Sequence, residues 1–297
     1  RMAGGVPKYV PLEVDVAQGR WKLNVEALEQ AISSSTRVIV LNSPHNPTGK
    51  VFTKEEMEGI ARIVEKWPQI TVVSDEVYKY TVHSMDHHHE HFASLPGMFN
   101  RTLTLSSAGK TFSVTGWQVG WIVGPRQLVK DIQRALPLLQ FCAATPMQQA
   151  LVEVLSTADE PYMGDESYYA WLCSLYRSKS TVLTSALKDA GLEVVGSQGG
   201  YFLTVDVSGV HVPERYYLRQ EAGGPGLTSV TKDVAFCRWI AEEAGVISIP
   251  VAPFWSPDRS PDEHPGSFVR FAFCKEDATL KEAGKRLSEL FRGGAPL

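Results

Sequence analysis

The chain has 297 residues, of which 43% are hydrophobic and 21% are charged, and its formal net charge is −4. This composition is typical of a globular protein and excludes a disordered or fibrous chain. The slight acidic excess argues against binding to nucleic-acid phosphates. No apolar run approaches the roughly 18 residues that a membrane helix needs. At about 150 residues per domain, the length predicts two domains.

The start of the chain carries no sign of a signal peptide, because no apolar core follows Arg1. The chain enters a strand-like stretch at Tyr9 without an introductory element, so we expect further sequence upstream. We predict a cytoplasmic protein, with a mitochondrial location left open, because a targeting peptide would precede Arg1. The cysteines stand far apart without a CxxC pair, which predicts reduced, mostly buried thiols rather than disulfides or a zinc site; they are Cys142, Cys173, Cys237 and Cys274.

The first half of the chain alternates strand-like and helix-like segments. The apolar run 37–41 predicts a strand buried on both faces of a parallel sheet, and a loop rich in Pro and Asn follows at 42–49. Thr53 and Glu56 have the spacing of a capping box at a helix start. That helix has one apolar face, made of Met57, Ile60, Ile63 and Val64.

Two more buried strands are predicted at 70–74 and 102–105. Each ends in polar residues, namely Asp75 to Tyr78 after the first and Ser106 to Lys110 after the second. Repeated strand–helix–strand order indicates an α/β domain with a mostly parallel sheet.

The second half has a different pattern. We predict a helix at 126–140 that Pro137 interrupts, and another that Pro146 opens and that runs to Leu155. The polar, breaker-rich segment 159–164 predicts a boundary between a large domain at 1–160 and a smaller α+β domain at 161–297. In the smaller domain we expect helices near 166–189, 233–244 and 277–291 and strands near 192–195, 201–207, 246–251 and 268–273.

Chemically distinctive residues follow three of the predicted strands. In open α/β sheets, ligands bind beyond the carboxyl ends of the strands, where this chain has Asn46, Asp75 with Tyr78, and Lys110. Taken singly, these residues are typical of a turn, a helix cap and a solvated lysine. Together they supply what is needed to hold and operate an aldehyde cofactor with an electron-poor ring.

The chemistry of such a cofactor explains the set. A lysine amine forms a Schiff base with a carbonyl and can carry a proton. A carboxylate such as Asp75 keeps the proton on a pyridine nitrogen, because an opposite charge favours the charged form. Tyr78 and Asn46 can donate to the ring oxygen, and the Ser107 hydroxyl can donate to a phosphate.

Three motifs carry a family resemblance: Asn-Ser-Pro-His-Asn-Pro-Thr-Gly at 42–49, Asp-Glu-Val-Tyr at 75–78 and Ser-Ala-Gly-Lys-Thr-Phe-Ser-Val-Thr-Gly-Trp at 107–117. With further matches at 93–98, 198–202 and 269–273, the chain resembles the fold-type I, class I pyridoxal-phosphate aminotransferases. The likeness is greatest to the kynurenine aminotransferases, also called glutamine transaminase K or cysteine-conjugate β-lyase.

The resemblance implies a fold and an activity. The fold is a large pyridoxal 5'-phosphate-binding domain with a mostly parallel sheet and a smaller C-terminal domain, with the family's N-terminal part expected before Arg1. The activity is transfer of an amino group from kynurenine, glutamine or another aromatic or sulfur amino acid to a 2-oxo acid. Elimination from cysteine conjugates is an implied side reaction, and a homodimer is the implied assembly, with neither nucleic acid nor membrane as partner.

The resemblance also implies roles at the cofactor. Lys110 is the Schiff-base lysine and general acid/base, Asp75 pairs with the ring nitrogen, and Tyr78 and Asn46 hold the ring oxygen. Ser107 binds the phosphate.

At the substrate, the resemblance implies that Arg270 grips the α-carboxylate, beside Asn46 and Tyr201. One position departs from the family pattern: Gln118 stands where a basic phosphate ligand is usual. Loss of that cation is expected to weaken the hold on the phosphate, because charge-assisted hydrogen bonds are the stronger ones.

The sequence also contains patterns that are typical of other sites. A nucleotide-binding P-loop at Gly109-Lys110-Thr111 is disfavoured, because Thr104 stands where that motif needs glycine. Histidines at 83, 87, 88, 89 and 91 with Glu90 form a tract that can bind metal, but we expect a solvated loop with adventitious binding and no metal site. An aromatic group could line a substrate pocket or pack in the core; its members are Phe141, Tyr201, Phe202, Phe254 and Trp255.

A non-enzymatic interpretation also stays open. A truncated aminotransferase homologue could fold and dimerise without turning over, and it would carry the same residues as the enzyme.

Overall fold

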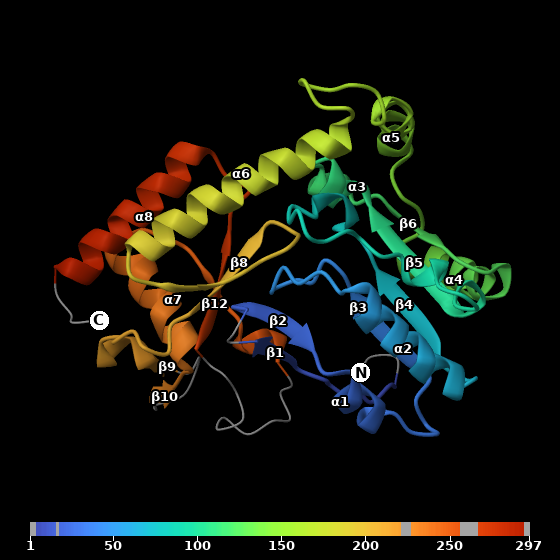
Figure 1. Cartoon of the computed structure of the whole chain (residues 1–297), viewed down its shortest axis with the longest axis horizontal. Helices are drawn as coiled ribbons and strands as arrows, with labels where there is room; N and C mark the ends of the chain where they lie inside the picture. Colours follow the sequence, from blue (N-terminus) through green and yellow to red (C-terminus); the bar gives the residue numbers. More distant parts are fainter. Residues whose placement is uncertain (1–3, 16–17, 221–226, 256–266, 294–297) are drawn as a thin grey trace.

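The computed structural model describes residues 4–15, 18–220, 227–255 and 267–293. A four-stranded sheet, in the order β3-β4-β5-β6, forms the first half of this part (Figure 1). The pairs β3–β4 and β4–β5 are parallel and β5–β6 is antiparallel, which confirms the mostly parallel sheet. Its strands are β3 (Val38–Asn42), β4 (Thr71–Asp75), β5 (Thr102–Ser107) and β6 (Gly120–Val123).

A second sheet of four antiparallel strands, in the order β11-β12-β8-β7, lies in the C-terminal half. It confirms the predicted α+β character of that half. Two further antiparallel strand pairs form small sheets of their own, β1 with β2 and β9 with β10. The bounds of these strands are β1 (Leu12–Asp15), β2 (Arg20–Leu23), β7 (Glu193–Val195), β8 (Phe202–Asp206), β9 (Leu218–Gln220), β10 (Leu227–Ser229), β11 (Ile249–Pro250) and β12 (Phe268–Ala272).

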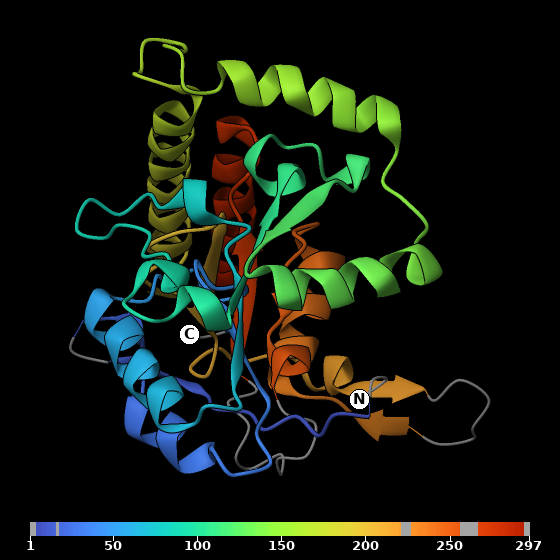
Figure 2. The ribbon, with the colours of Figure 1, turned by 90° about the vertical axis from the view of Figure 1, so that its right-hand side faces the viewer.

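The helices surround these sheets, and α6 runs beside α8 along one side of the molecule (Figures 1 and 2). None of the helices in the described ranges is long and apolar enough to cross a membrane. Their bounds are α1 (Val25–Ala31), α2 (Lys54–Lys66), α3 (Ala108–Thr111), α4 (Arg126–Leu139), α5 (Thr145–Thr157), α6 (Tyr168–Asp189), α7 (Lys232–Glu243) and α8 (Asp277–Arg292).

The capping box that opens α2 is confirmed. Thr53 Oγ1 accepts a hydrogen bond from the Glu56 amide at 3.2 Å, and Glu56 Oε2 accepts one from the Thr53 amide at 2.8 Å. The helix then packs its predicted apolar face into one core with Ile39, Leu41 and Val72 of the sheet. Local capping and long-range packing therefore agree on where this helix begins and which face it buries.

Strand β3 differs from the prediction for residues 37–41. Ile39 and Leu41 are buried, but Val38 and Val40 are 51% and 69% exposed, so β3 is not buried on both faces. Successive strand side chains point to opposite faces of a sheet. In the described part of the chain, α2 packs against the face of Ile39 and Leu41, and β3 is the edge strand of its sheet.

Two other predictions in this chain were wrong in detail. Helix α4 continues through Pro137 to Leu139, because a proline this near the end removes a hydrogen bond only from the last turn. The strand predicted at 246–251 shrinks to the two residues of β11, where Pro250 has no N–H to donate.

The cysteines are free, as expected, but they are not mostly buried. Cys237 is buried and Cys173 is partly buried, whereas Cys142 and Cys274 are exposed. Both exposed cysteines lie just beyond the end of a regular element, where the chain leaves its packed layer.

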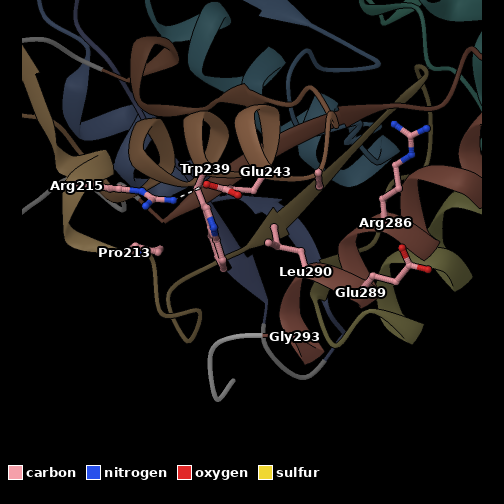
Figure 3. Close-up of a pocket in the computed structure, with 9 residues that line it drawn as sticks. Pro213, Arg215, Trp239, Glu243, Arg286, Glu289, Leu290 and Gly293 are labelled. Carbon is pink, nitrogen blue, oxygen red and sulfur yellow. Dashed lines mark hydrogen bonds and ion pairs between the residues drawn. The ribbon is translucent and has the colours of Figure 1, made fainter.

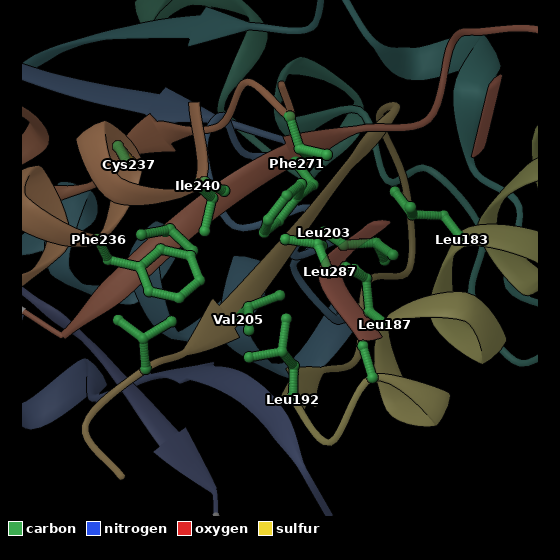
Figure 4. Close-up of a cluster of buried hydrophobic side chains, with 14 of the residues drawn as sticks. Leu183, Leu187, Leu192, Leu203, Val205, Phe236, Cys237, Ile240, Phe271 and Leu287 are labelled. Carbon is green, nitrogen blue, oxygen red and sulfur yellow. The ribbon is translucent and has the colours of Figure 1, made fainter. Parts of the chain in front are cut away.

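The larger core lies between the second sheet and the helices α6, α7 and α8. In Figure 4, Leu187 of α6, Leu203 of β8 and Leu287 of α8 point toward one another. Phe236 of α7 and Phe271 of β12 belong to the same cluster. These elements hold β12 in place, and β12 carries one of the predicted site residues.

The core predicts a difference in stability between the loss of a buried and of an exposed apolar side chain. Replacing the fully buried Leu187 with alanine should lower the free energy of unfolding by about 2–5 kcal/mol, because it removes apolar contacts and leaves a cavity. Ile247→Ala is the control, since Ile247 is 82% exposed and its loss should change stability by less than about 0.5 kcal/mol. Urea denaturation followed by circular dichroism measures both. Equal losses would contradict the described core.

Candidate active site

The register of the parallel strands brings the predicted site residues to one edge of the first sheet. Asn42, the last residue of β3, is paired with Asp75, the last residue of β4, and Asp75 is paired with Leu105 of β5. The loop that carries Asn46 leaves β3 at this edge, and α3 with Lys110 begins directly after β5. The strand-end residues predicted from the sequence therefore come together.

Lys110 is placed by a tight turn into α3. Ser107 caps this short helix, its Oγ accepting a hydrogen bond from the Gly109 amide at 3.2 Å. A Cβ at Gly109 would lie 2.9 Å from the Thr115 Cα, so a larger residue would push the following loop away. The turn brings the Lys110 Nζ to 6.0 Å from the centre of the Tyr78 ring.

Asp75 stands where a positively charged partner would be favoured. Its Oδ1 accepts a hydrogen bond from the Val77 amide at 3.3 Å. Burial raises the pKa of Asp75, and the neighbouring Glu76 raises it further, while the charge of Lys110 lowers it. A cation placed against this carboxylate would offset the cost of its burial.

Tyr78 offers a protonated phenol. The residue is buried, and its ring meets the rings of Tyr201 at 5.4 Å and of Phe202 at 5.9 Å edge-on. Burial raises the pKa of Tyr78 far above its ordinary value, and Tyr201 raises it further. The hydroxyl therefore keeps its proton near neutral pH and can donate it in a hydrogen bond.

A hydrogen bond between the two halves of the chain places Arg270. This residue lies in β12, and its Nη1 donates to Asn46 Oδ1 at 2.5 Å. The guanidinium carbon lies 4.3 Å from the ring centre of Phe202 and 5.4 Å from that of Phe254. A guanidinium has five N–H donors, so the bond to Asn46 leaves others for a carboxylate. Because Oδ1 accepts from Arg270, the amide of Asn46 presents its NH₂ group as the remaining donor.

These groups fit pyridoxal phosphate by their chemistry. An amine, a half-buried carboxylate that favours a cation, a protonated phenol and an amide lie together at one sheet edge. The amine matches the aldehyde of the cofactor and the carboxylate matches its ring nitrogen. The phenol and the amide both match its ring oxygen.

The two predicted phosphate ligands, Ser107 and Gln118, lie on either side of α3, Ser107 directly before it and Gln118 in the loop between α3 and β6. The Ser107 oxygen accepts the capping bond and still has its own proton to donate. Gln118 is exposed, has a φ of 53°, and donates from Nε2 to the Thr115 carbonyl at 2.8 Å. Its side chain is thus held against its own loop.

An aromatic cavity of about 200 Å³ adjoins Arg270 through Phe254. Of the aromatic group named above, Phe254 and Trp255 line this cavity, whereas Tyr201 and Phe202 pack against Tyr78 instead. Phe141 is 82% exposed beyond the end of α4 and is not among the lining residues. No sequence pattern predicted three further residues of the lining with aromatic rings, Tyr9, Trp21 and His45.

A larger cavity, of about 540 Å³, lies elsewhere, between α7, α8 and the segment before β9 (Figure 3). Arg215 and Glu243 form an ion pair at its edge. None of the predicted site residues lines it. Size alone therefore does not locate the chemistry of this chain.

The histidine tract is not simply a solvated loop. His83 is buried against Phe273 and receives a bond from Arg177, whose Nε donates to the His83 carbonyl at 2.9 Å. The side chains of His89 and His91 reach back to Glu76. The prediction of full solvation fails because contacts with residues far along the chain fold this loop inward.

Comparison with known proteins shows the family of this chain. The family model "Aminotransferase class I and II" matches residues 1–287, and the chain belongs to that family. It is 40% identical over 301 residues to kynurenine–oxoglutarate transaminase of Dictyostelium discoideum, an alignment covering 97% of this chain and 67% of that protein. It is 37% identical to kynurenine–oxoglutarate transaminase 3 of Rattus norvegicus, covering 98% of this chain and 62% of the relative.

Solved structures show the same fold-type I aminotransferase architecture. N-succinyldiaminopimelate aminotransferase from Mycobacterium tuberculosis matches with a TM-score of 0.81 and 34% identity, over 97% of this chain and 67% of that one. YbdL of Escherichia coli, with a methionine aminotransferase function, matches with a TM-score of 0.75 and 31% identity, over 91% and 62%. The chain thus spans about two thirds of the length of these relatives.

The burial of His83 predicts that the stability of the folded chain depends on pH. Burial, and then the charge of Arg177, lower the pKa of His83 to about 4 from an ordinary 6.5. The unfolded chain binds this proton more readily, so stability should fall as the pH drops from about 6.5 to about 4. His83→Gln should reduce that slope by about one proton, measured by urea denaturation at several pH values. The exposed His88→Gln should keep the parent slope, and an unchanged slope in His83→Gln would refute the assignment.

Proposed function

We propose that this chain carries the catalytic residues of a pyridoxal-phosphate-dependent aminotransferase. The observation that supports it most is the convergence of Lys110, Asp75 and Tyr78 at one sheet edge, with Arg270 bonded to Asn46 beside them. The family membership supports the same chemistry. The reaction would move an amino group from an L-amino acid to a 2-oxo acid.

The residues divide this work by their chemistry. When bound, pyridoxal phosphate supplies an aldehyde that condenses with amines and a ring that accepts the electrons of the substrate's Cα–H bond. The Lys110 amine takes the proton from the substrate's Cα and delivers it to the carbon that the aldehyde contributes, C4′. Asp75 holds a proton on the ring nitrogen, Tyr78 and Asn46 donate to the ring oxygen, and Ser107 donates to the phosphate.

Two of the three proposed substrate contacts come from the second half of the chain. Arg270 would bind the α-carboxylate with its planar fork of N–H donors, with Asn46 and Tyr201 beside it. The aromatic cavity next to Phe254 favours an aromatic side chain, and the two named relatives above are kynurenine–oxoglutarate transaminases. We therefore propose kynurenine or another aromatic amino acid as donor and 2-oxoglutarate or a similar 2-oxo acid as acceptor.

Finer features of the function rest on the same proposal. Glutamine and sulfur amino acids are alternative donors, and a substrate with a leaving group on its β carbon would lose that group by elimination once Lys110 has taken the Cα proton. We also retain the division into a large domain at 1–160 and a small one at 161–297, and a cytoplasmic location, as proposals.

Assembly is the second proposal. Several large apolar side chains are exposed on α4, on α5 and on the link between them, which supports an interface in a homodimer; they are Leu138, Leu139, Phe141, Val152 and Leu155. A homologue that only dimerises would show this interface without turnover. Amino-acid addition to the cofactor-loaded chain separates the two, because only an active site changes its absorbance.

Lys110 should be the lysine that carries the cofactor. Borohydride reduction of the chain mixed with pyridoxal phosphate, followed by peptide mass mapping, should place the adduct on Lys110. Lys110→Ala should lose it, whereas Lys79→Ala, which removes a lysine from the Tyr78 side of the same sheet edge, should keep it. An adduct on another lysine in the parent chain would overturn the proposed function.

Gln118 should limit the affinity for the phosphate. Gln118→Lys supplies the basic residue that the family pattern has at this position and should tighten cofactor binding about five- to tenfold, because charge-assisted hydrogen bonds are stronger than neutral ones. Titration of the cofactor by absorbance gives the dissociation constant. Gln118→Asn keeps the site neutral in a residue that tolerates positive φ and should bind as the parent does. Equal affinity in the lysine variant would remove position 118 from the phosphate site.

A further inference from the structure

Three side chains outside the proposed cofactor site converge on one point. The Glu76 carboxylate is buried, and its Oε2 lies 2.9 Å from Nε2 of His89 and 2.5 Å from Nδ1 of His91. The potential ligand atoms of all three residues lie within 4.8 Å of one another. The two imidazole rings stand nearly perpendicular, at 83°, with centres 4.6 Å apart, so both nitrogens approach the same oxygen from different directions.

His89 is not satisfied by the protein alone. Its side chain is only 8% exposed, and its Nδ1 has no hydrogen-bond partner among the described residues. A buried polar atom without a partner is rare, and an ordered water is one common reason for it. A metal bound at Nε2 would fix the proton on Nδ1, where it can donate to water, as metal-bound histidines commonly do.

Glu76 is held in place from its other oxygen. The buried Ser74 donates from Oγ to Glu76 Oε1 at 2.9 Å, which leaves Oε2 facing the two histidines. The backbone amide of Glu76 also donates to the Leu105 carbonyl at 3.1 Å. Carboxylates that bind metal ions are commonly oriented by such a second hydrogen bond.

We propose that Glu76, His89 and His91 form a binding site for a divalent transition-metal ion, with Zn²⁺ as the best match. Two imidazole nitrogens and one carboxylate oxygen are a zinc ligand set that leaves the fourth position open. Ligand atoms at about 2.1 Å in a tetrahedron lie about 3.4 Å apart. The two nitrogens must therefore each move about 0.5–1 Å from the oxygen.

The site is also accessible. The His91 side chain is 45% exposed, so an ion can enter from solvent and a water or an external ligand can take the fourth position. Two other histidines of the tract are not part of the site. His87 Nδ1 lies 3.2 Å from Ser84 Oγ, and His88 is exposed. These two serve as matched controls, because they share the tract without sharing Glu76.

The test measures zinc in the untagged chain. After stripping with a chelator, titration with Zn²⁺ and dialysis should leave one zinc ion per chain by elemental analysis. His89→Ala and His91→Ala should each weaken binding at least tenfold, and Ser74→Ala, which removes the positioning bond, about tenfold. His87→Ala and His88→Ala should bind as the parent does. Because the His91 side chain is exposed, we expect His91→Ala to fold as the parent does, and circular dichroism checks this.

Two results would overturn the site. One is a parent chain that retains less than half an equivalent of zinc after dialysis. The other is equal weakening by His88→Ala and His91→Ala, which would show adventitious binding spread over the tract. Because Co²⁺ in a four-coordinate site absorbs visible light, its absorbance gives a second readout that should vanish in His91→Ala. This test needs no cofactor and no turnover, so it stands apart from the test of Lys110.

Discussion

The parallel register of β3, β4 and β5 is the constraint on which the site depends. Parallel strands end at the same edge of a sheet, and here Asn42 stands beside Asp75 and Asp75 beside Leu105. Every group assigned to the cofactor ring lies at one of these strand ends or within a few residues after it. A slip of two residues in one strand would keep its buried face but would move Asp75 by about 6–7 Å along the sheet, out of reach of its partners.

The second half of the chain is fixed to this edge by backbone contacts. Gly49 accepts hydrogen bonds at its carbonyl from the amides of Gln198 and Gly199, each at 2.9 Å. A Cβ at Gly49, where φ is 70°, would overlap the Ser197 side chain, and one at Gly199 would lie 2.7 Å from Pro44. Only glycine permits so close an approach. This contact brings β8 and β12 near the loop of Asn46, so that Arg270 reaches its amide.

What could be predicted from the sequence is what local patterns determine. The capping box at Thr53, the strand ending at Asp75 and the turn at Lys110 each depend on residues a few positions apart. The exposure of Val40 could not be predicted, because it depends on which elements cover the sheet. The inward fold of the histidine tract was missed for the same reason, since Glu76 lies 13 positions before His89. Each failure concerns a contact that the spacing of residues does not encode.

Two adjacent acids show how far the structure separates neighbouring residues. Burial acts on Asp75 and Glu76 in the same direction and raises the pKa of each. For Asp75 the pKa stays raised, which suits a carboxylate awaiting a cation. For Glu76, hydrogen bonds from His89 and His91 and their charges outweigh burial and lower the pKa to about 2. Environments that push two carboxyl groups apart give them different tasks, one toward the proposed cofactor and one toward the histidines.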